Sequence, residues 1–144
     1  MIKNHFIKGA ISPDFVAKAI EKYQVKTNIG AYDIFLGQVR ADQIDGRVVR
    51  AIEFSAYEEM ANKGLMELME TCFEKFNLTG GHIYHSLGEV KTGEICFFVF
   101  TSSGHRPDAF AGTQFLVNEI KKQIPIFGKE IFEDETHQWK VNKL

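Results

Sequence analysis

The residues best suited to chemistry in this sequence are cations near the two ends of one expected helix. His105 and Arg106 stand at its start, in the segment T-S-S-G-H-R-P-D-A-F. Free backbone N–H groups and the positive end of the helix dipole favour an anion there, which indicates a site for phosphate or carboxylate. Lys121 and Lys129 lie near the other end. Because the formal net charge of the chain is only −2, this local concentration of cations indicates a binding site and not a general nucleic-acid surface.

Arg40, at the end of an expected strand, adds a further cation to this set. Arginine offers bidentate geometry for phosphate, and a lysine beside other cations can have its pKa lowered into the range useful for proton transfer. Each of these side chains alone is more often a solvated surface charge. Together, Arg40, His105, Arg106, Lys121 and Lys129 predict an anion site at which a lysine can also move a proton.

A metal site is the first competing interpretation, because H-I-Y-H places His82 and His85 close together, with Cys72 and Cys96 as possible further ligands. On a strand, however, residues three positions apart point to opposite faces. The two imidazoles therefore cannot bind one ion together. We expect no metal site in this protein.

A serine hydrolase is the second competing interpretation, because Ser102 and Ser103 lie near His105. No G-x-S-x-G elbow surrounds these serines, which a nucleophile of that kind requires. A serine just before a helix is more simply a cap for its first turn. We therefore expect the two hydroxyls to cap the helix that follows.

The composition is that of an ordinary globular domain, with 144 residues, 44% hydrophobic and 25% charged. We expect a single domain over 1–144, without a linker or a repeat. No apolar run reaches the length of a membrane span, and the N-terminus lacks the apolar region of a signal peptide. These features predict a cytoplasmic protein that binds neither membrane nor nucleic acid. Cys72 and Cys96 form no C-x-x-C pair, so we expect reduced thiols that serve packing.

The cations depend on an expected α+β order of elements. Helices are expected over 13–23, 57–77 and 106–123, and strands over 2–8, 28–40, 47–55, 82–87, 94–102, 126–132 and 136–141. The strand over 28–40 is partly apolar on both faces, which predicts a central position in the sheet. Gly80 and Gly81 are expected to end the second helix, and 41–46 to form a polar loop.

Four segments, in this order and spacing, resemble the large, catalytic subunit of molybdopterin synthase. They are G-A-Y-D-I-F-L-G-Q-V-R, H-I-Y-H-S-L-G-E-V-K-T-G-E, T-S-S-G-H-R-P-D-A-F and I-K-K-Q-I-P-I-F-G-K-E, with Trp139 beyond them. The resemblance covers about 30–139. It implies an α/β hammerhead-type fold with an additional small antiparallel β subdomain.

The resemblance also implies an activity and partners. The family forms a homodimer with two small ubiquitin-like subunits, which makes a heterotetramer. Sulfur passes from the thiocarboxylated C-terminus of the small subunit to cyclic pyranopterin monophosphate, and the product is the dithiolene of molybdopterin. No permanently bound cofactor is implied, because the partner supplies the sulfur. Phe132 and Trp139 are candidates for the surface that holds the small subunit, although each could equally pack on its own core.

Carried over residue by residue, the family's substrate pocket falls on Gln38, Val39, Arg40, His105, Arg106, Lys121, Gly128, Lys129 and Glu130. One position departs from the family. Many members carry a basic pair after an aromatic residue, whereas this chain has Phe127-Gly128-Lys129, so the first lysine of the pair is missing. The resemblance implies Lys121 as the main catalytic residue, and it leaves open whether Lys129 takes the place of the missing lysine.

Helix geometry adds a constraint that the motifs do not contain. Sixteen positions separate His105 from Lys121, and a continuous helix would hold them roughly 24 Å apart. One small pterin cannot touch both. The helix must break, or one subunit must supply His105 and Arg106 while the other supplies Lys121, and we favour the second arrangement. A non-enzymatic phosphate- or nucleotide-binding module and a purely structural assembly subunit remain the alternatives to an enzyme.

Overall fold

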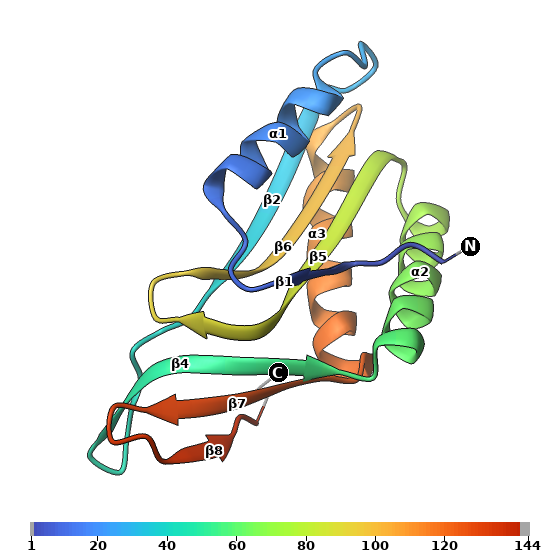
Figure 1. The fold of residues 1–144 in the computed structure, drawn as a ribbon. Coiled ribbons are helices and arrows are strands. Elements are labelled where there is room, and N and C mark those ends of the chain that lie inside the picture. Colours follow the sequence, from blue (N-terminus) through green and yellow to red (C-terminus); the bar gives the residue numbers. More distant parts are fainter. Residues whose placement is uncertain (1, 142–144) are drawn as a thin grey trace.

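Three helices and an eight-stranded sheet make up residues 2–141, which the computed structural model describes (Figure 1). The helices are α1 (Pro13–Tyr23), α2 (Glu58–Lys75) and α3 (Arg106–Gln123). The strands are β1 (Phe6–Lys8), β2 (Ala31–Gln38), β3 (Gln43–Ile44), β4 (Arg47–Ala56), β5 (Leu78–Lys91), β6 (Ile95–Ser103), β7 (Ile126–Phe132) and β8 (His137–Trp139). The order is β2-β6-β5-β4-β7-β8, with β1 beside β5 and β3 beside β4. All pairs except β1–β5 are antiparallel, so the expected α+β class is confirmed.

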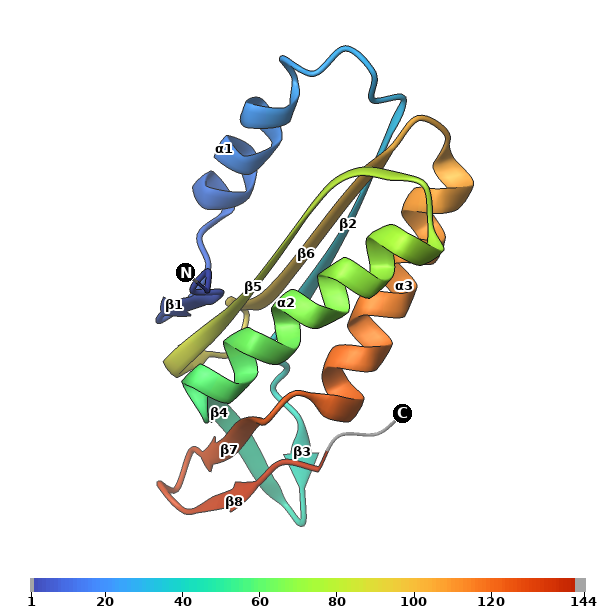
Figure 2. The same ribbon diagram turned by 90° about the vertical axis from the view of Figure 1, so that its right-hand side faces the viewer.

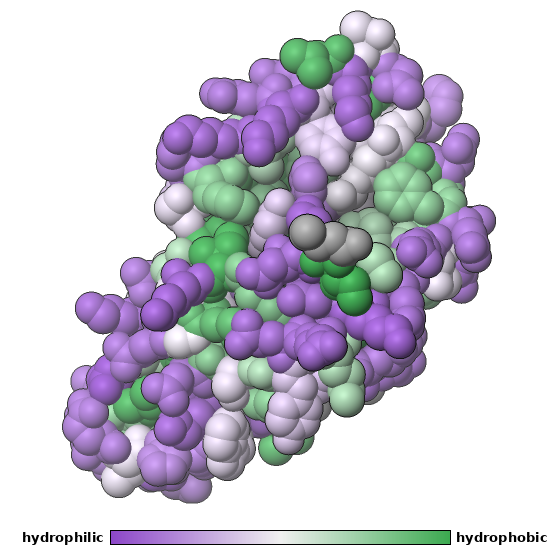
Figure 3. Space-filling view, turned by 45° about the vertical axis from the view of Figure 1, so that its right-hand side comes forward, coloured by the Kyte–Doolittle hydropathy of each residue, from purple (hydrophilic) through white to green (hydrophobic). Residues whose placement is uncertain are grey.

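The helices lie on both faces of the sheet, as Figure 2 shows, with α1 on one face and α2 and α3 on the other. Alternate residues of a strand point to opposite faces, and β6 supplies apolar side chains to both. Phe98 and Phe100 pack in the cluster beneath α1, whereas Phe97 and Val99 pack in the cluster with α2 and α3. On the face of the molecule drawn in Figure 3, apolar side chains are exposed only in separate patches among hydrophilic ones.

Helix α1 begins where the sequence predicts. The Phe15 N–H donates to the Ser12 hydroxyl at 3.1 Å, and Pro13 occupies the first turn, where its missing N–H leaves no bond unmade. The predicted end at Tyr23 is also confirmed. This helix covers the face of the sheet opposite to α3, the helix that carries Lys121 (Figure 2).

Gly80 and Gly81 do not end α2, contrary to the prediction. The helix ends at Lys75, and both glycines lie inside β5. The reason is close packing on each side of that strand. A Cβ at Gly80 would lie 2.4 Å from Cε1 of Tyr23, and one at Gly81 would lie 3.1 Å from Sδ of Met69.

The central position predicted for the strand over 28–40 is wrong. Strand β2 lies at one end of the strand order and pairs with β6. Its two apolar faces have another cause, because helices cover both of them. Ile34 packs in the cluster beneath α1, and Phe35 packs in the cluster with α3.

Strand β5 is longer than predicted and joins two parts of the sheet. Its pairing with β6 reaches His85, and from Gly88 onward it pairs with β4. Gly88 has a φ of +85°, a conformation that glycine adopts without the strain of a side chain, and it marks the bend between the two parts. The second part, β4 with β3, β7 and β8, is the small antiparallel β subdomain that was expected.

The expected polar loop over 41–46 contains a short strand. β3 pairs with the start of β4 through a two-residue turn at Asp45 and Gly46, both with positive φ. Such a turn matches the twist of an antiparallel hairpin, and Asp-Gly is a sequence that favours it. The hairpin stands beside Arg40.

Candidate functional site

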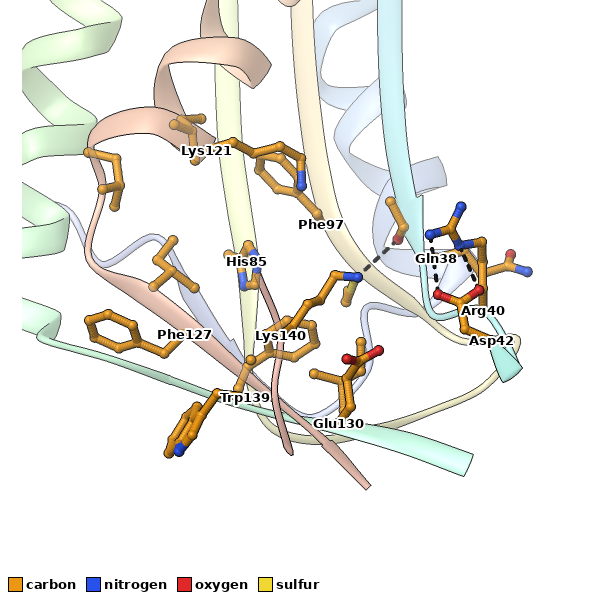
Figure 4. A pocket seen from close by; sticks show the side chains of 18 of the residues that line it. Gln38, Arg40, Asp42, His85, Phe97, Lys121, Phe127, Glu130, Trp139 and Lys140 are labelled. Carbon is orange, nitrogen blue, oxygen red and sulfur yellow. Dashed lines mark hydrogen bonds and ion pairs between the residues drawn. The ribbon is translucent and has the colours of Figure 1, made fainter. Parts of the chain in front are cut away.

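A cavity of about 670 Å³ opens where the two parts of the sheet meet the last turn of α3 (Figure 4). Strands β2, β4, β5, β6, β7 and β8 contribute to its wall, together with the end of α3 and the residue that follows β8. Of the nine substrate-pocket residues that the family resemblance implies, five line this cavity: Gln38, Arg40, Lys121, Gly128 and Glu130. These five residues come from three separate segments of the sequence, and only the fold brings them together.

Lys121 is the lysine that α3 places at the cavity. Its Nζ lies 5.8 Å from the centroid of the Phe97 ring. Much of the side chain remains accessible to solvent, yet the surrounding walls desolvate the ammonium group and thereby lower its pKa. The Cys96 thiol opposes that shift, and the positive charge of Lys140 adds to it. Desolvation of this kind favours the neutral amine form of the lysine, which can accept a proton.

Arg40 lies at the rim of the cavity, with 75% of its side chain exposed. Its Nε is 3.2 Å from Oδ1 of Asp42, and its Nη2 donates to Oδ2 of the same carboxylate at 3.3 Å. The neighbouring Val39 has a different role, because it is 2% exposed and packs in the core. Val39 therefore supports the cavity from behind and does not line it.

Lys129, for which the resemblance leaves open a place beside Lys121, does not line the cavity within one chain. Four other residues of β7, Ile126, Phe127, Gly128 and Glu130, line the cavity, whereas Lys129 does not. The Nζ of Lys129 lies 3.2 Å from Oε1 of Glu53 on the neighbouring strand β4. Within one chain, this lysine is engaged in an ion pair across the sheet.

His105 and Arg106 lie at the opposite end of α3, and both are exposed. Helix α3 is continuous over 18 residues, which corresponds to about 27 Å. One small ligand cannot contact these two residues and Lys121 in the same chain. The helix does not break, so a site that uses both ends requires a second copy of the chain.

The prediction that Ser102 and Ser103 cap α3 is wrong. The N-cap position is His105, and no side chain accepts a capping bond there. The Ser103 hydroxyl donates to the His105 carbonyl at 2.5 Å, and the Ser102 hydroxyl pairs with that of Thr79 at 2.8 Å. The serines therefore fix the loop before α3 and leave its N–H groups open.

His85 is a cavity residue that sequence reasoning considered only as a metal ligand. It is 8% exposed, lies between the rings of Phe54 and Phe97, and its pKa is lowered to about 4 mainly by burial. Its Nδ1 lies 2.9 Å from the Ser86 carbonyl, which can only accept, so the neutral ring carries its hydrogen on Nδ1. The other ring nitrogen, Nε2, is thus left as an acceptor.

His82 lies on the other face of β5, as the spacing predicts. Its ring packs 5.1 Å from that of Tyr23, in the layer beneath α1. Burial, with help from nearby lysines, lowers its pKa to about 4. The two histidines are therefore separated by the sheet and share no ligand.

Both cysteines are buried, as expected. Burial raises the pKa of Cys72 to about 11 and also raises that of Cys96. Cys96 nevertheless lines the cavity, where its thiol donates to the Gly37 carbonyl at 3.5 Å. Both groups are held as thiols near neutral pH, a form that is a poor nucleophile.

Comparisons with known proteins agree with this architecture. The family model described as MoaE protein matches residues 10–123. The molybdopterin synthase catalytic subunit of Emericella nidulans is 34% identical over 114 residues, which cover 79% of this chain and 58% of that protein. The crystal structure of molybdopterin synthase from Staphylococcus aureus superimposes with a TM-score of 0.84 at 27% identity, over 99% of this chain and 100% of that chain.

A further solved structure shares the fold. It is a complex of subunits 1 and 2 of the molybdopterin-converting factor from Helicobacter pylori, with a TM-score of 0.81, 20% identity, and coverage of 96% of this chain and 90% of that one. The α+β fold of this chain is thus shared with several known structures. The chain belongs to the MoaE protein family.

Proposed function

We propose that this protein is the catalytic subunit of a molybdopterin synthase. It transfers sulfur from the thiocarboxylated C-terminus of a small ubiquitin-like subunit to cyclic pyranopterin monophosphate and so builds the dithiolene. The observation that carries the proposal is Lys121, an amine with a lowered pKa inside a cavity, in a chain of the MoaE family. Membership alone would not say which residues act.

The substrate's phosphate needs cations to hold it and to stabilise the charge that develops as its ring opens. Arg40 at the rim of the cavity supplies one guanidinium. The phosphate either displaces Asp42 from this group or shares the group with it. Arg106 and His105 supply the other cations from a second copy of the chain. Lys121 then lies near the reacting carbons, where its ammonium form can protonate a leaving oxygen and its amine form can accept a proton.

The sulfur comes from a partner and not from this chain. Both cysteines have raised pKa values, which disfavours a persulfide route through either thiol. An extended C-terminal Gly-Gly tail carries no side chains, so it can reach a cavity through a narrow approach. No permanently bound cofactor is needed in this scheme.

The small subunit requires apolar surface beside the cavity. Phe127 and Trp139 line the cavity and are 38% and 60% exposed, and the Tyr57 ring packs 5.2 Å from that of Phe127. These three aromatic side chains are the surface that we assign to the partner. Phe132, the other candidate from the sequence, is fully buried and packs in the core. Among residues 2–141, no helix is long and apolar enough to cross a membrane.

A reconstituted reaction tests the proposal. The purified chain is incubated with a thiocarboxylated small subunit and cyclic pyranopterin monophosphate, and the dithiolene product is measured. We expect product only when all three components are present. Binding of cyclic pyranopterin monophosphate without any product, in the presence of a competent small subunit, would instead favour a non-enzymatic phosphate-binding module.

A further inference from the structure

The cavity contains a second lysine that none of the sequence motifs includes. Lys140 directly follows β8, and its backbone N–H donates to the Gly128 carbonyl at 2.7 Å. Because Lys129 pairs with Trp139 in the antiparallel register, the next residues in line are Gly128 and Lys140. Residues opposite each other on antiparallel strands project to the same face, so Lys140 is directed to the face on which Gly128 lines the cavity.

Side chains from both lysines reach the same space. Lys121 and Lys140 line the main cavity and also an adjoining hollow beside β3. Figure 4 shows the Lys140 side chain extending into the cavity from the β7 side, while Lys121 enters it from the end of α3. The charge of Lys140 is one of the causes that lower the pKa of Lys121, which agrees with their proximity.

Strand β7 itself supplies no cation at this place. Gly128 has no side chain, and a Cβ on it would meet Cγ2 of Ile52 at 3.0 Å and Cε1 of Phe54 at 3.3 Å. Lys129 is turned to the other face and paired with Glu53. The cation on this wall is therefore Lys140, which follows the neighbouring strand β8 and lies opposite Gly128.

The charges in the cavity favour an anionic occupant. Its carboxylates already have partners, since Asp42 is bound by Arg40 and Glu130 accepts from Nε2 of Gln138 at 3.2 Å. In the part of the chain from 2 to 141, neither Lys121 nor Lys140 forms an ion pair. Two ammonium groups that face one cavity repel each other, and an anion between them relieves that repulsion.

We propose that Lys140 is a second substrate-binding cation of this cavity and that, together with Lys121, it contacts an anionic oxygen of the phosphate-bearing substrate. The inference rests on the proposed function and adds a residue to the same site. In this inference Lys140, which follows the adjoining strand β8, takes the place of the lysine that is missing at position 128, and Lys129 does not.

Steady-state sulfur transfer tests this assignment. The variants are Lys140→Ala, Lys140→Arg, Lys129→Ala and, as a matched control, Lys122→Ala, whose side chain is exposed beside Lys121 and paired with Glu119. We expect Lys140→Ala to lower kcat/KM by about ten- to a hundredfold, as for the loss of a hydrogen bond to a charged group. Lys140→Arg should retain part of the activity, because it keeps the charge. Lys122→Ala should stay within about twofold of the wild type, as for a surface ion pair.

A rescue variant separates substrate binding from folding. In Gly128→Lys with Lys140→Ala, an ammonium group returns to the same face from β7, and we expect part of the lost kcat/KM to return. The assignment is overturned if Lys140→Ala behaves like Lys122→Ala, or if Lys129→Ala loses more activity than Lys140→Ala.

Amine labelling on the wild-type chain provides a readout that does not need turnover. Lysines are acylated with and without cyclic pyranopterin monophosphate, in the absence of the small subunit, and the sites are quantified by mass spectrometry. We expect the compound to protect Lys121 and Lys140 but not Lys122. A wild-type chain without sulfur transfer would refute the proposed function alone, whereas unprotected Lys140 beside protected Lys121 would refute the present inference alone.

Discussion

The two ends of helix α3 carry the same sign of charge in different surroundings. At the N-terminal end, His105 and Arg106 are exposed to solvent, beside open backbone N–H groups. At the C-terminal end, Lys121 stands at a cavity whose walls lower its pKa. Cations in open solvent are screened and can attract an anion, whereas desolvation at the cavity shifts Lys121 toward the neutral amine, which can accept a proton.

The comparison suggests that the N-terminal end of α3 binds the substrate and that the C-terminal end carries out the chemistry. The open end is suited to hold a phosphate, and it becomes a site only when another surface closes over it. The enclosed end is suited to the chemistry, because its amine and its neutral imidazole are already positioned. Since α3 is continuous, a second copy of the chain is the surface that can join the two ends.

The largest effect is expected from Lys121→Ala, which removes the amine at the enclosed end. We expect kcat to fall by about a hundred- to a thousandfold, in the range of general acid–base catalysis, with a smaller change in KM. Turnover is measured in the reconstituted reaction, with Lys122→Ala as the control on the same turn of helix. A loss confined to KM would mean that Lys121 only binds the substrate.

The next effect concerns His85, whose pKa of about 4 is lowered from 6.5 by burial in the enclosed region. The folded protein holds the ring neutral, so below pH 6.5 the unfolded chain binds the proton more readily. The contribution of His85 to the free energy of unfolding is therefore fully present above pH 6.5 and is lost as the pH falls toward 4. The loss from this group amounts to about 3 kcal/mol at most. Denaturant unfolding of the wild type and of His85→Phe at several pH values measures it, and equal slopes in this window would contradict it.

Arg106→Ala should have a more moderate effect, because the open end binds and does not react. We expect kcat/KM to fall by about tenfold, mainly through KM, as for the loss of a charged hydrogen bond. The measurement is substrate titration in the same assay. A fall in kcat comparable to that of Lys121→Ala would contradict the claim that the N-terminal end of α3 only binds the substrate.

The smallest effect is expected from replacing both thiols. Cys72→Ala with Cys96→Ala should keep kcat within about threefold of the wild type, since a thiol with a raised pKa is a poor nucleophile. Circular dichroism and thermal unfolding verify the fold, because both side chains are buried. Loss of turnover in a well-folded double variant would point to a persulfide enzyme.

The sequence predicted the helices well and the sheet less well. The Ser12 cap and Pro13 located the start of α1, because these signals are local, and the bounds of α3 were also predicted correctly although its expected serine caps are absent. Gly80 and Gly81 were assigned to a helix end, since nothing local reveals that Tyr23 and Met69 pack against them. The apolar faces of β2 indicated a central strand, but two helices cover an edge strand equally well.

The site shows the same limit. Motifs named Lys121 and Arg40 because both lie in segments typical of the family. They could not show that Lys129 faces away from the cavity, which depends on the pleat of β7, or that Lys140 faces toward it, which depends on pairing across to β8. No motif contains Lys140, and only the register of two short strands reveals it.

Complementation between two impaired chains tests the central claim most directly. The first chain carries both His105→Ala and Arg106→Ala, so that both cations of the N-terminal end of α3 are removed. It is mixed with the Lys121→Ala chain to give verified heterodimers. If each cavity takes its open-end cations from one copy and its lysine from the other, one of the two cavities in each heterodimer is intact. We predict sulfur transfer approaching half that of the wild type, and the absence of any gain over the parent variants in such heterodimers would contradict the shared site.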